Sequence, residues 1–417
     1  MDPTCDCLHG TGYDSTPCYS AAMVPLLRGV RILELSTVVM GPLAGQILAD
    51  LGAEVIKIEA LEGDIARNTL PQGDGDGAMF VNNNRNKRVV AVDLKSPSGR
   101  EIVRKLIARS DGLLINMRPV AAQRLGLGFD DAAKINPDLV YCAVIGFGEA
   151  GPYRGRPAFD DVIQAAGGMA DVGRRDDEPP RFAATIVADK IGALHAAYAF
   201  LGALTAKARG HKGPLYVEVP MFETLAAFVL NEHLCGATFA QDGQVGYSRI
   251  LSRNRRPFRS QDGWIAVLPY TGEQWRRFLA EVARTDLLSQ TWFNTPEGRN
   301  AHIDELYAAV SDAIGRRTNT DWCEVLNRLD IPYSPVASLQ DLLTDPHLSA
   351  IGFFEPGENY PPSIRRKLAQ PVTFRGIEAV EDQPPHRLGA DTRDVLRECG
   401  YSEQEIDGML QKREIAQ

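Results

Sequence analysis

Hydrophobic residues occur in short runs along the first half of the chain, separated by segments whose apolar positions recur at helical spacing. The runs are apolar on both faces, which is typical of strands in a parallel sheet that is covered on both sides. Strands are predicted at 30–35, 53–59, 88–94, 111–117, 139–147 and 215–221, and helices at 41–52, 98–109, 121–125, 130–135 and 223–239. This alternation predicts a doubly wound, Rossmann-like α/β domain.

The pattern changes after residue 240, where a basic loop replaces the alternation. A strand is then predicted at 263–270, followed by helices at 273–284, 302–315 and 320–329. These elements predict a smaller α+β domain, and the tail is extended and then helical. The predicted division is a flexible leader at 1–22, the first part of the large α/β domain at 23–225, the small α+β domain at 226–345, and a return segment with C-terminal helices at 346–417 that completes the large domain.

One acidic residue stands at the start of the most apolar stretch of the chain. Residues 191–206 are mostly Ala, Leu, Gly, Tyr and Phe, which predicts a helix of roughly 16–18 residues that is buried on most faces. Asp189 precedes this helix and has two interpretations. It is either an N-cap, a position where Asp is favoured, or a catalytic carboxylate. The local sequence leaves both open, and His195 inside the helix is interpreted as a core histidine.

Composition and charge exclude several classes of protein. The 417 residues carry a formal net charge of −9, which argues against nucleic acid as a partner because phosphates require a basic surface. No apolar run reaches the roughly 20 residues of a membrane span. The seven scattered cysteines are typical of a reduced, cytoplasmic protein. Cys5, Cys7 and Cys18 are not expected to bind a metal, because no second ligand pair follows at zinc-site spacing.

The segment GFGEAG at 146–151 matches the dinucleotide-binding pattern but lacks its context. That fingerprint must open directly into a helix whose N-terminus holds the pyrophosphate. Here Pro152 and a further turn follow instead. We therefore predict no nicotinamide site, and interpret the glycines as a tight loop at the carboxyl end of a strand.

Six motifs in order carry a resemblance to a known family. They are PLLRGVRILELSTVVMGPLAGQILADLGAEVIKIEALEGDIAR, NRNKRVVAVDLKSPSGREIVRKLIARSDGLLINMRPVAAQRLGLG, INPDLVYCAVIGFGEAGPY, FDDVIQAAGGM, HKGPLYVEVPMFE and LGADTRDVLRECGYSEQEI. Together they run from Pro25 to Ile406 and resemble family III CoA-transferases, the group of formyl-CoA transferase and carnitine CoA-transferase.

The resemblance implies a function for Asp189, which stands at the position of the family's catalytic nucleophile. It implies that CoA passes from an acyl-CoA donor, with succinyl-CoA a candidate, to a free carboxylic acid through an aspartyl-CoA thioester on this residue. Coenzyme A and acyl-CoA are then substrates, and no separate cofactor or metal is implied. The resemblance also implies an interlocked homodimer.

The matched motifs further imply contacts with CoA. Three departures from the family pattern bear on them: Ala60 replaces an arginine often found there, Ala193 follows Gly192 where glycine is expected, and the glycine-rich loop of formyl-CoA transferase is absent. The missing loop argues against formate–oxalate exchange. The implied CoA-binding residues are Val38 and Val39 beside the adenine, with Lys87, Arg88 and Arg124 at the phosphates and Asn116 close by.

Two alternatives remain in the same fold. An α-methylacyl-CoA racemase or epimerase needs two bases, one of them a histidine before the acid at the position of Asp160, and this chain has Phe159 there. A non-catalytic CoA-binding protein is the other. Phe159 and Asp160 are substrate-pocket candidates, as are Arg253 and Arg256. These arginines fit either a second carboxylate of a dicarboxylic substrate, or an exposed basic loop or phosphate contact.

Overall fold

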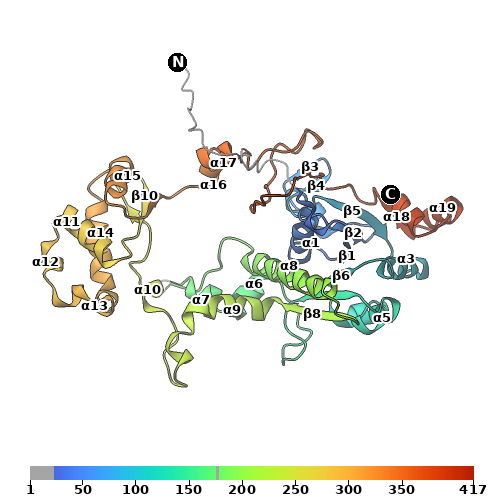
Figure 1. Ribbon diagram of the computed structural model, residues 1–417, viewed down its shortest axis with the longest axis horizontal. Coiled ribbons are helices and arrows are strands. Elements are labelled where there is room, and N and C mark those ends of the chain that lie inside the picture. Colours follow the sequence, from blue (N-terminus) through green and yellow to red (C-terminus); the bar gives the residue numbers. More distant parts are fainter. Residues whose placement is uncertain (1–22, 175–177) are drawn as a thin grey trace, which may run out of the picture. The chain divides into compact units, whose positions relative to one another are not determined.

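The computed structural model describes residues 23–174 and 178–417, which form two compact units (Figure 1). Unit 1 holds the chain up to Arg156, Asp189–Pro220 and Thr344–Gln417. Unit 2 holds Pro157–Ala188 and Met221–Leu343. Each unit is therefore assembled from segments that are distant in the sequence.

Unit 1 is built on a seven-stranded sheet with the order β12-β5-β2-β1-β6-β7-β8. All neighbours from β5 to β8 pair in parallel, and β12 pairs antiparallel with β5. The strands are β1 (Arg31–Leu35), β2 (Glu54–Glu59), β5 (Lys87–Val92), β6 (Gly112–Ile115), β7 (Val140–Ile145), β8 (Leu215–Pro220) and β12 (Ile415–Ala416). Successive strands are added first on one side of β1 and then on the other, so the topological switch point lies between β1 and β6.

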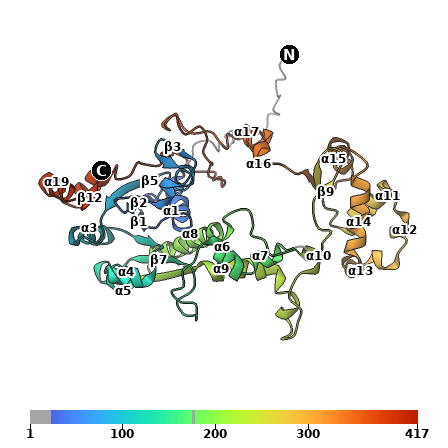
Figure 2. The same cartoon turned by 180° about the vertical axis from the view of Figure 1, so that it is seen from behind.

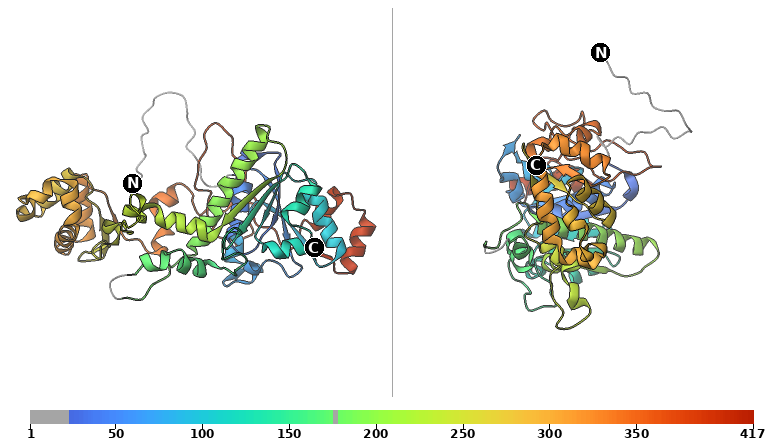
Figure 3. Two further views of the ribbon diagram at one scale, coloured as in Figure 1. Left: turned by 90° about the horizontal axis from the view of Figure 1, so that it is seen from below. Right: turned by 90° about the vertical axis from the view of Figure 1, so that its left-hand side faces the viewer.

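Helices cover both faces of this sheet, as the sequence predicts (Figure 3). One face packs in a common core with five helices: α3 (Pro97–Ile107), α4 (Pro119–Arg124), α5 (Phe129–Ile135), α18 (Thr392–Glu398) and α19 (Glu403–Gln411). The opposite face carries α1 (Met40–Asp50) and α8 (Val187–Ala208). Gly112 of β6 lies against the ring of Phe200 of α8 on that face. Smaller elements are the hairpin β3 (Gln72–Gly73) and β4 (Asp76–Gly77), with α2 (Ala78–Val81) and α17 (Pro346–Ala350).

Two glycines allow α1 to approach β1 closely. A Cβ on Gly41 would lie 2.3 Å from Ser36 Cβ, and a Cβ on Gly45 would lie 1.9 Å from Glu34 Oε2. The two glycines are four residues apart and therefore lie on one face of the helix. Their lack of a side chain sets the distance between α1 and the turn that follows β1.

Helix α8 is longer and less buried than the sequence predicts. It has 22 residues and begins at Val187, two residues before Asp189. Leu194 and Tyr198 are 59% and 61% exposed, although the composition predicts burial on most faces. The expectation is wrong in this respect, because a single chain covers only the side of α8 that faces the sheet. His195 is half-buried and its Nδ1 lies 2.8 Å from the carbonyl oxygen of Ile191, so it is not a core residue.

Unit 2 contains a three-stranded antiparallel sheet and its own apolar core (Figure 2). Residues such as Ile265, Phe278 and Trp322 are at most 1% exposed in this core. Its elements are α6 (Asp160–Ala166), α7 (Met169–Val172), α9 (Met221–His233), α10 (Ser248–Leu251), β9 (Phe258–Arg259), β10 (Trp264–Val267), α11 (Gly272–Glu281), α12 (Thr285–Leu288), α13 (Pro296–Ala301), α14 (Ile303–Ile314), α15 (Asn319–Arg328), β11 (Tyr333–Pro335) and α16 (Leu339–Leu342).

The division into units differs from the sequence-based division at 157–188. The sequence places this segment in the large domain, whereas the structure groups it with unit 2. The physical reason is the packing of α6 on α9, where the backbone of Gly167 lies against Leu225. The predicted leader at 1–22 lies outside the described residues.

We predict that Gly45→Ala lowers the free energy of unfolding by about 2 kcal/mol or more, because the new methyl group would overlap the buried Glu34 carboxylate. Gly408→Ala in α19 is the matched control, since no atom lies within 4 Å of its added Cβ. This control should raise stability by about 0.5–1 kcal/mol. Chemical denaturation measures both, and equal stability of the two variants would contradict the packing described for α1.

Candidate functional site

The carboxyl ends of β1 and β6 meet at the switch point of the sheet. Thr37 follows β1 and Asn116 follows β6. Asn116 Nδ2 donates to the carbonyl oxygen of Thr37 at 2.8 Å, and the Thr37 N–H donates to Asn116 Oδ1 at 3.1 Å. Open α/β sheets bind their ligands in the crevice at this point. Asn116, predicted from the sequence, therefore lies where the topology places a ligand.

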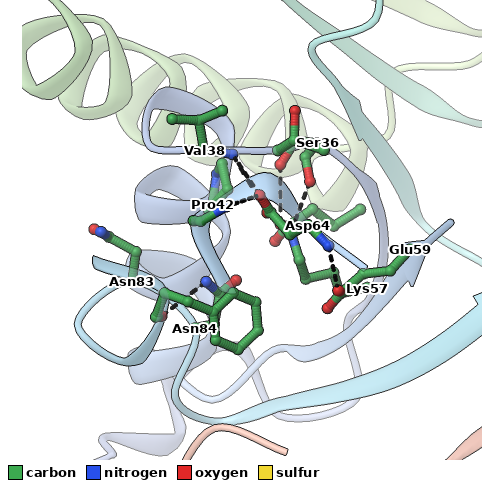
Figure 4. A network of polar contacts seen from close by, with 12 residues as sticks. Ser36, Val38, Pro42, Lys57, Glu59, Asp64, Asn83 and Asn84 are labelled. Carbon is green, nitrogen blue, oxygen red and sulfur yellow. Dashed lines mark hydrogen bonds and ion pairs between the residues drawn. The ribbon is translucent and has the colours of Figure 1, made fainter. Parts of the chain in front are cut away.

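The turn after β1 has an unusual backbone conformation at Val38. Its φ is +70°, in the left-handed region that β-branched residues rarely adopt. The Val38 N–H donates to both carboxylate oxygens of Asp64, at 3.0 and 3.3 Å (Figure 4). Asp64 is fully buried and also accepts from the N–H of Ala66 at 3.0 Å. A buried carboxylate far along the chain thus holds the turn.

Four charged side chains form a buried network below this turn, part of which Figure 4 shows. Lys57 Nζ lies 3.0 Å from Asp64 Oδ2 and 3.2 Å from Glu34 Oε1, and donates to the carbonyl oxygen of Ser36 at 2.6 Å. Glu34 Oε2 lies 2.8 Å from Lys87 Nζ. All four side chains have 0% exposure. The charges of two carboxylates and two ammonium groups therefore cancel in the core, where an unpaired charge is strongly destabilising.

The two lysines of the network differ in their pKa. Burial lowers the pKa of Lys87 to about 8, against the opposing attraction of Glu34. Desolvation also acts on Lys57, but Glu34 and Asp64 outweigh it and raise the pKa of that lysine. The difference arises because Lys57 lies between two carboxylates, whereas Lys87 contacts one.

Three predicted CoA contacts are corrected by these positions. Lys87 has no exposed side-chain surface, and its Nζ donates to the carbonyl oxygen of Pro42 at 2.7 Å. Arg88 Nη1 lies 2.9 Å from Glu54 Oε1. Both residues lie at the amino ends of their strands, and the crevice lies at the carboxyl ends. Val39 is 1% exposed and offers no side-chain surface. These positions argue against contacts between CoA and the side chains of Lys87, Arg88 and Val39.

Arg124 remains available to an anion. It is the last residue of α4, the helix that follows β6, and its side chain is exposed. No ion pair to Arg124 is found among the described residues. Its position and its charge fit the predicted role at a phosphate.

Asp189 lies in the first turn of α8, as its third residue, and is half-exposed. The N-cap is the residue before the first helical residue, so the N-cap interpretation of Asp189 is off by three residues. Near it, Gly192 packs on α1, since a Cβ there would lie 2.5 Å from Met40 Cε. Met40 is the first residue of α1 and comes two residues after Val38. The helix turn that carries Asp189 thus packs beside the turn at the crevice.

A buried glutamine of unit 2 holds the segment that leads into α8. Gln164 is 0% exposed, and its Oε1 accepts from the N–H of Ala183 at 2.8 Å. Its Nε2 donates to the carbonyl oxygen of Thr185 at 3.2 Å and to Asp160 Oδ2 at 2.6 Å. Asp160, a predicted pocket residue, therefore acts with Gln164 in fixing residues 183–185.

The other predicted pocket residues, Phe159, Arg253 and Arg256, belong to unit 2. Phe159 precedes α6 and is 73% exposed. Arg253 lines a cavity of about 410 Å³ together with Arg174 and Asp304, whereas Arg256 is exposed and is not among the residues that line this cavity.

Three further expectations concern a metal site, a membrane span and a dinucleotide-binding site. Cys5, Cys7 and Cys18 lie outside the described residues. Among the residues that are described, no group of three or more His, Cys, Asp or Glu side chains is arranged to hold a metal ion. No helix in the same part of the chain has the length and apolarity to cross a membrane. After β7, the GFGEAG segment forms turns, and the next helix begins only at Asp160.

Sequence reasoning missed three residues that shape the site: Lys57, Asp64 and Gln164. A signal was present for the first, since Glu34 and Lys57 interrupt otherwise apolar strands. Charged residues inside buried strands need partners. No local pattern identifies Asp64 or Gln164, because their contacts are made over long sequence separations.

Comparison with known proteins decides the family. The sequence model described as CoA-transferase family III matches residues 27–392. The chain belongs to CoA-transferase family III. Among its relatives, (R)-2-hydroxy-4-methylpentanoate CoA-transferase of Clostridioides difficile is 29% identical, over 94% of this chain and 99% of the relative. Succinyl-CoA:glutarate CoA-transferase of Mus musculus is 29% identical, over 96% and 92% respectively.

Family III membership agrees with the structure. An aspartate-to-alanine variant of Rv3272 from Mycobacterium tuberculosis, solved as a crystal structure, superposes with a TM-score of 0.79 and 28% identity. The match covers 90% of this chain and 99% of that chain. The α/β architecture of this chain is therefore the architecture of a family III CoA-transferase.

We predict that Lys87→Met leaves CoA binding unchanged but alters how stability depends on pH. With a folded-state pKa of about 8 and an ordinary value of 10.5, Lys87 loses its proton in the folded state first. Between these values the unfolded chain holds more protons, so raising the pH stabilises the wild type. The free energy of unfolding of the wild type, measured from pH 8 to 10.5, should rise relative to that of Lys87→Met. Parallel curves for the two proteins would contradict the lowered pKa of Lys87.

Proposed function

We propose that this protein transfers coenzyme A from an acyl-CoA donor to a free carboxylic acid, with Asp189 as the covalent carrier. The observation that carries the proposal is the place of Asp189 in a family III CoA-transferase. Its helix turn packs beside the N-terminus of α1, at the crevice between β1 and β6. The relatives named above are CoA-transferases, which supports the same reaction class here.

The proposed reaction proceeds through four acyl transfers. The Asp189 carboxylate attacks the donor thioester, forming a mixed anhydride and releasing CoA thiolate. The thiolate attacks the aspartyl carbonyl, which gives an aspartyl-CoA thioester and releases the donor acid. The acceptor carboxylate attacks this thioester, forming a second mixed anhydride and releasing CoA thiolate. The thiolate finally attacks the acceptor carbonyl of this anhydride, which gives the acceptor's acyl-CoA and restores the Asp189 carboxylate. Covalent catalysis divides one difficult exchange into easier steps and requires no further cofactor.

The surroundings of Asp189 suit a nucleophile. A carboxylate in the first turn of a helix is stabilised by the positive end of the helix dipole. The buried residues that follow, Ile191 and Ala193, are apolar. An apolar wall limits hydrolysis of the reactive anhydride and thioester by water.

The proposed CoA contacts are Val38, Asn116 and Arg124. Val38 and Asn116 lie on the two sides of the crevice at the ends of β1 and β6, and Arg124 ends the helix that follows β6. Together they offer an apolar surface, an amide and a guanidinium, which fit an adenine, polar ribose groups and a phosphate.

The nature of the acids is a further part of the proposal. Relatives named for glutarate and for 2-hydroxy-4-methylpentanoate handle a dicarboxylic and a branched hydroxy acid. Arg253, in its cavity with Arg174, favours a substrate with a second carboxylate, and succinyl-CoA is the donor to test first. A racemase is disfavoured because the phenyl ring of Phe159 cannot accept a proton.

An interlocked homodimer in the cytoplasm completes the proposal. The exposed apolar face of α8 at Leu194 and Tyr198 supports dimerisation, since such a face is buried when a second chain covers it. The scattered cysteines support a reducing compartment.

We predict that Asp189→Asn abolishes CoA transfer and leaves the free energy of unfolding within about 1 kcal/mol of wild type. An amide cannot attack a thioester, so the rate should fall by several orders of magnitude, on the order of 10³-fold or more. CoA exchange between succinyl-CoA and a panel of acids, followed by mass spectrometry, measures the loss. Asp171→Asn, on α7, is the control and should retain activity. More than about a tenth of wild-type activity in Asp189→Asn, which corresponds to about 1.4 kcal/mol, would refute a covalent role.

We predict that the protein is a dimer at micromolar concentration and that Tyr198→Glu weakens dimerisation, because a charge on the covered face of α8 would be desolvated. Light scattering measures the mass of both proteins. A monomeric wild type would contradict the proposed assembly.

A further inference from the structure

Val38 carries backbone strain at the crevice. Its φ of +70° is costly for a β-branched residue, and such strain persists only where surrounding contacts enforce it. The turn that contains it joins β1 to α1 at the switch point of the sheet, where ligands bind in this architecture. The strained residue therefore lies at the end of the sheet where a ligand is expected to bind.

Asp64 provides the contacts that enforce it. Both of its oxygens lie within hydrogen-bond distance of the Val38 N–H, at 3.0 and 3.3 Å (Figure 4). A left-handed residue directs its N–H differently from a residue with negative φ, so this bond depends on the strained conformation. The carboxylate has 0% exposure and is held in turn by Lys57 Nζ at 3.0 Å.

Further bonds fix Asp64 and Lys57 in their positions. The N–H of Asp64 donates to Glu59 Oε2 at 2.8 Å, and Glu59 receives two bonds from Arg67, each of 2.8 Å. Lys57 donates to the carbonyl oxygen of Ser36, two residues before Val38. The turn is thus bound at Ser36 by the lysine and at Val38 by the carboxylate.

We propose that Asp64 and Lys57 are positioning residues that hold Val38 in the left-handed conformation and so preset the crevice turn for the nucleotide end of CoA. This inference rests on the proposed function, since it names the ligand of the same crevice. Neither residue needs to contact CoA. The free energy that holds the strained turn is supplied by a buried ion pair on folding, so CoA does not have to order the turn when it binds.

Removal of Asp64 and relief of the strain at Val38 test the proposal together. In Asp64→Ala the turn relaxes to negative φ, and CoA binding should weaken by about tenfold, the order of the cost of a left-handed residue. Glycine adopts this conformation freely. Val38→Gly alone removes the apolar contact with CoA and should weaken binding, but in the Val38→Gly background Asp64→Ala should cause at most about a threefold further loss, against about tenfold in the wild-type background.

Isothermal titration of the full chain with free CoA measures affinity, and initial rates with succinyl-CoA separate KM from kcat. The KM for acyl-CoA should rise in Asp64→Ala more than kcat falls. Asp50→Ala is the matched control, because Asp50 is another buried carboxylate paired with an arginine, Arg85, in unit 1. It should lose stability without a loss of CoA affinity, in the wild-type and in the Val38→Gly background alike.

Each outcome decides the proposal. Unchanged CoA affinity in Asp64→Ala, or a loss from Asp64→Ala that is as large in the Val38→Gly background as in the wild type, would overturn it. If Asp64→Ala does not fold, Asp64→Asn with and without Val38→Gly replaces it, and the same dependence on Val38 is expected from a smaller loss. A wild type that binds no CoA would instead refute the proposed function, so the two failures are distinguishable.

Discussion

Glu34 is a buried carboxylate within strand β1. The ion pairs that neutralise its charge fix much of the structure of unit 1 next to the crevice. The charge is balanced by Lys57 on the neighbouring strand β2 and by Lys87 on the next strand, β5, and Lys57 in turn binds Asp64. Because a buried charge without a partner is strongly destabilising, these strands and the turn after β1 are fixed together. Gly45 on α1 leaves the space that the Glu34 carboxylate occupies. The ligand-binding end of the sheet is therefore held by ion pairs that lie beneath it.

The same constraint connects the crevice with the proposed nucleophile. The turn at Val38 leads directly into α1, and the first residue of α1, Met40, packs against Gly192 of α8. Asp189 lies one turn before Gly192. A change in the position of α1 would therefore move both the turn proposed to bind CoA and the helix that carries the carboxylate. This arrangement gives a physical reason for the small residues at these contacts, since Gly41 and Gly45 let α1 approach β1 and its turn, and Gly192 lets α8 approach Met40.

The sequence predicts the architecture of unit 1 well and its site only in part. Apolar runs such as VVAV and VYCAVI identify buried parallel strands, because few other structures bury both faces of so short a segment. The antiparallel β12 is missed, since a strand of two residues has no periodicity to detect. The apolar stretch draws attention to Asp189, but only the family resemblance gives this residue a catalytic role. Helix α8 begins at Val187, four residues before the stretch that starts at residue 191.

The errors among the CoA contacts have a common physical cause. Lys87 and Arg88 are adjacent basic residues, and a sequence does not reveal whether such residues face solvent or buried carboxylates. Their partners, Glu34 and Glu54, lie on other strands and become neighbours only when the sheet forms. Asp64 and Gln164 were missed for the same reason, because each acts on backbone groups that are distant in the chain.

The central claim is that the Asp189 carboxylate takes part covalently in CoA transfer. It is tested most directly by turnover with an acceptor acid labelled with ¹⁸O in its carboxylate, followed by mass analysis of the peptide that contains Asp189. In the proposed sequence of steps an acceptor oxygen remains on the aspartyl carboxylate when the final thiolate attack occurs at the acceptor carbonyl. The peptide that contains Asp189 should therefore carry ¹⁸O after turnover. Transfer of CoA without any label in the peptide would contradict it.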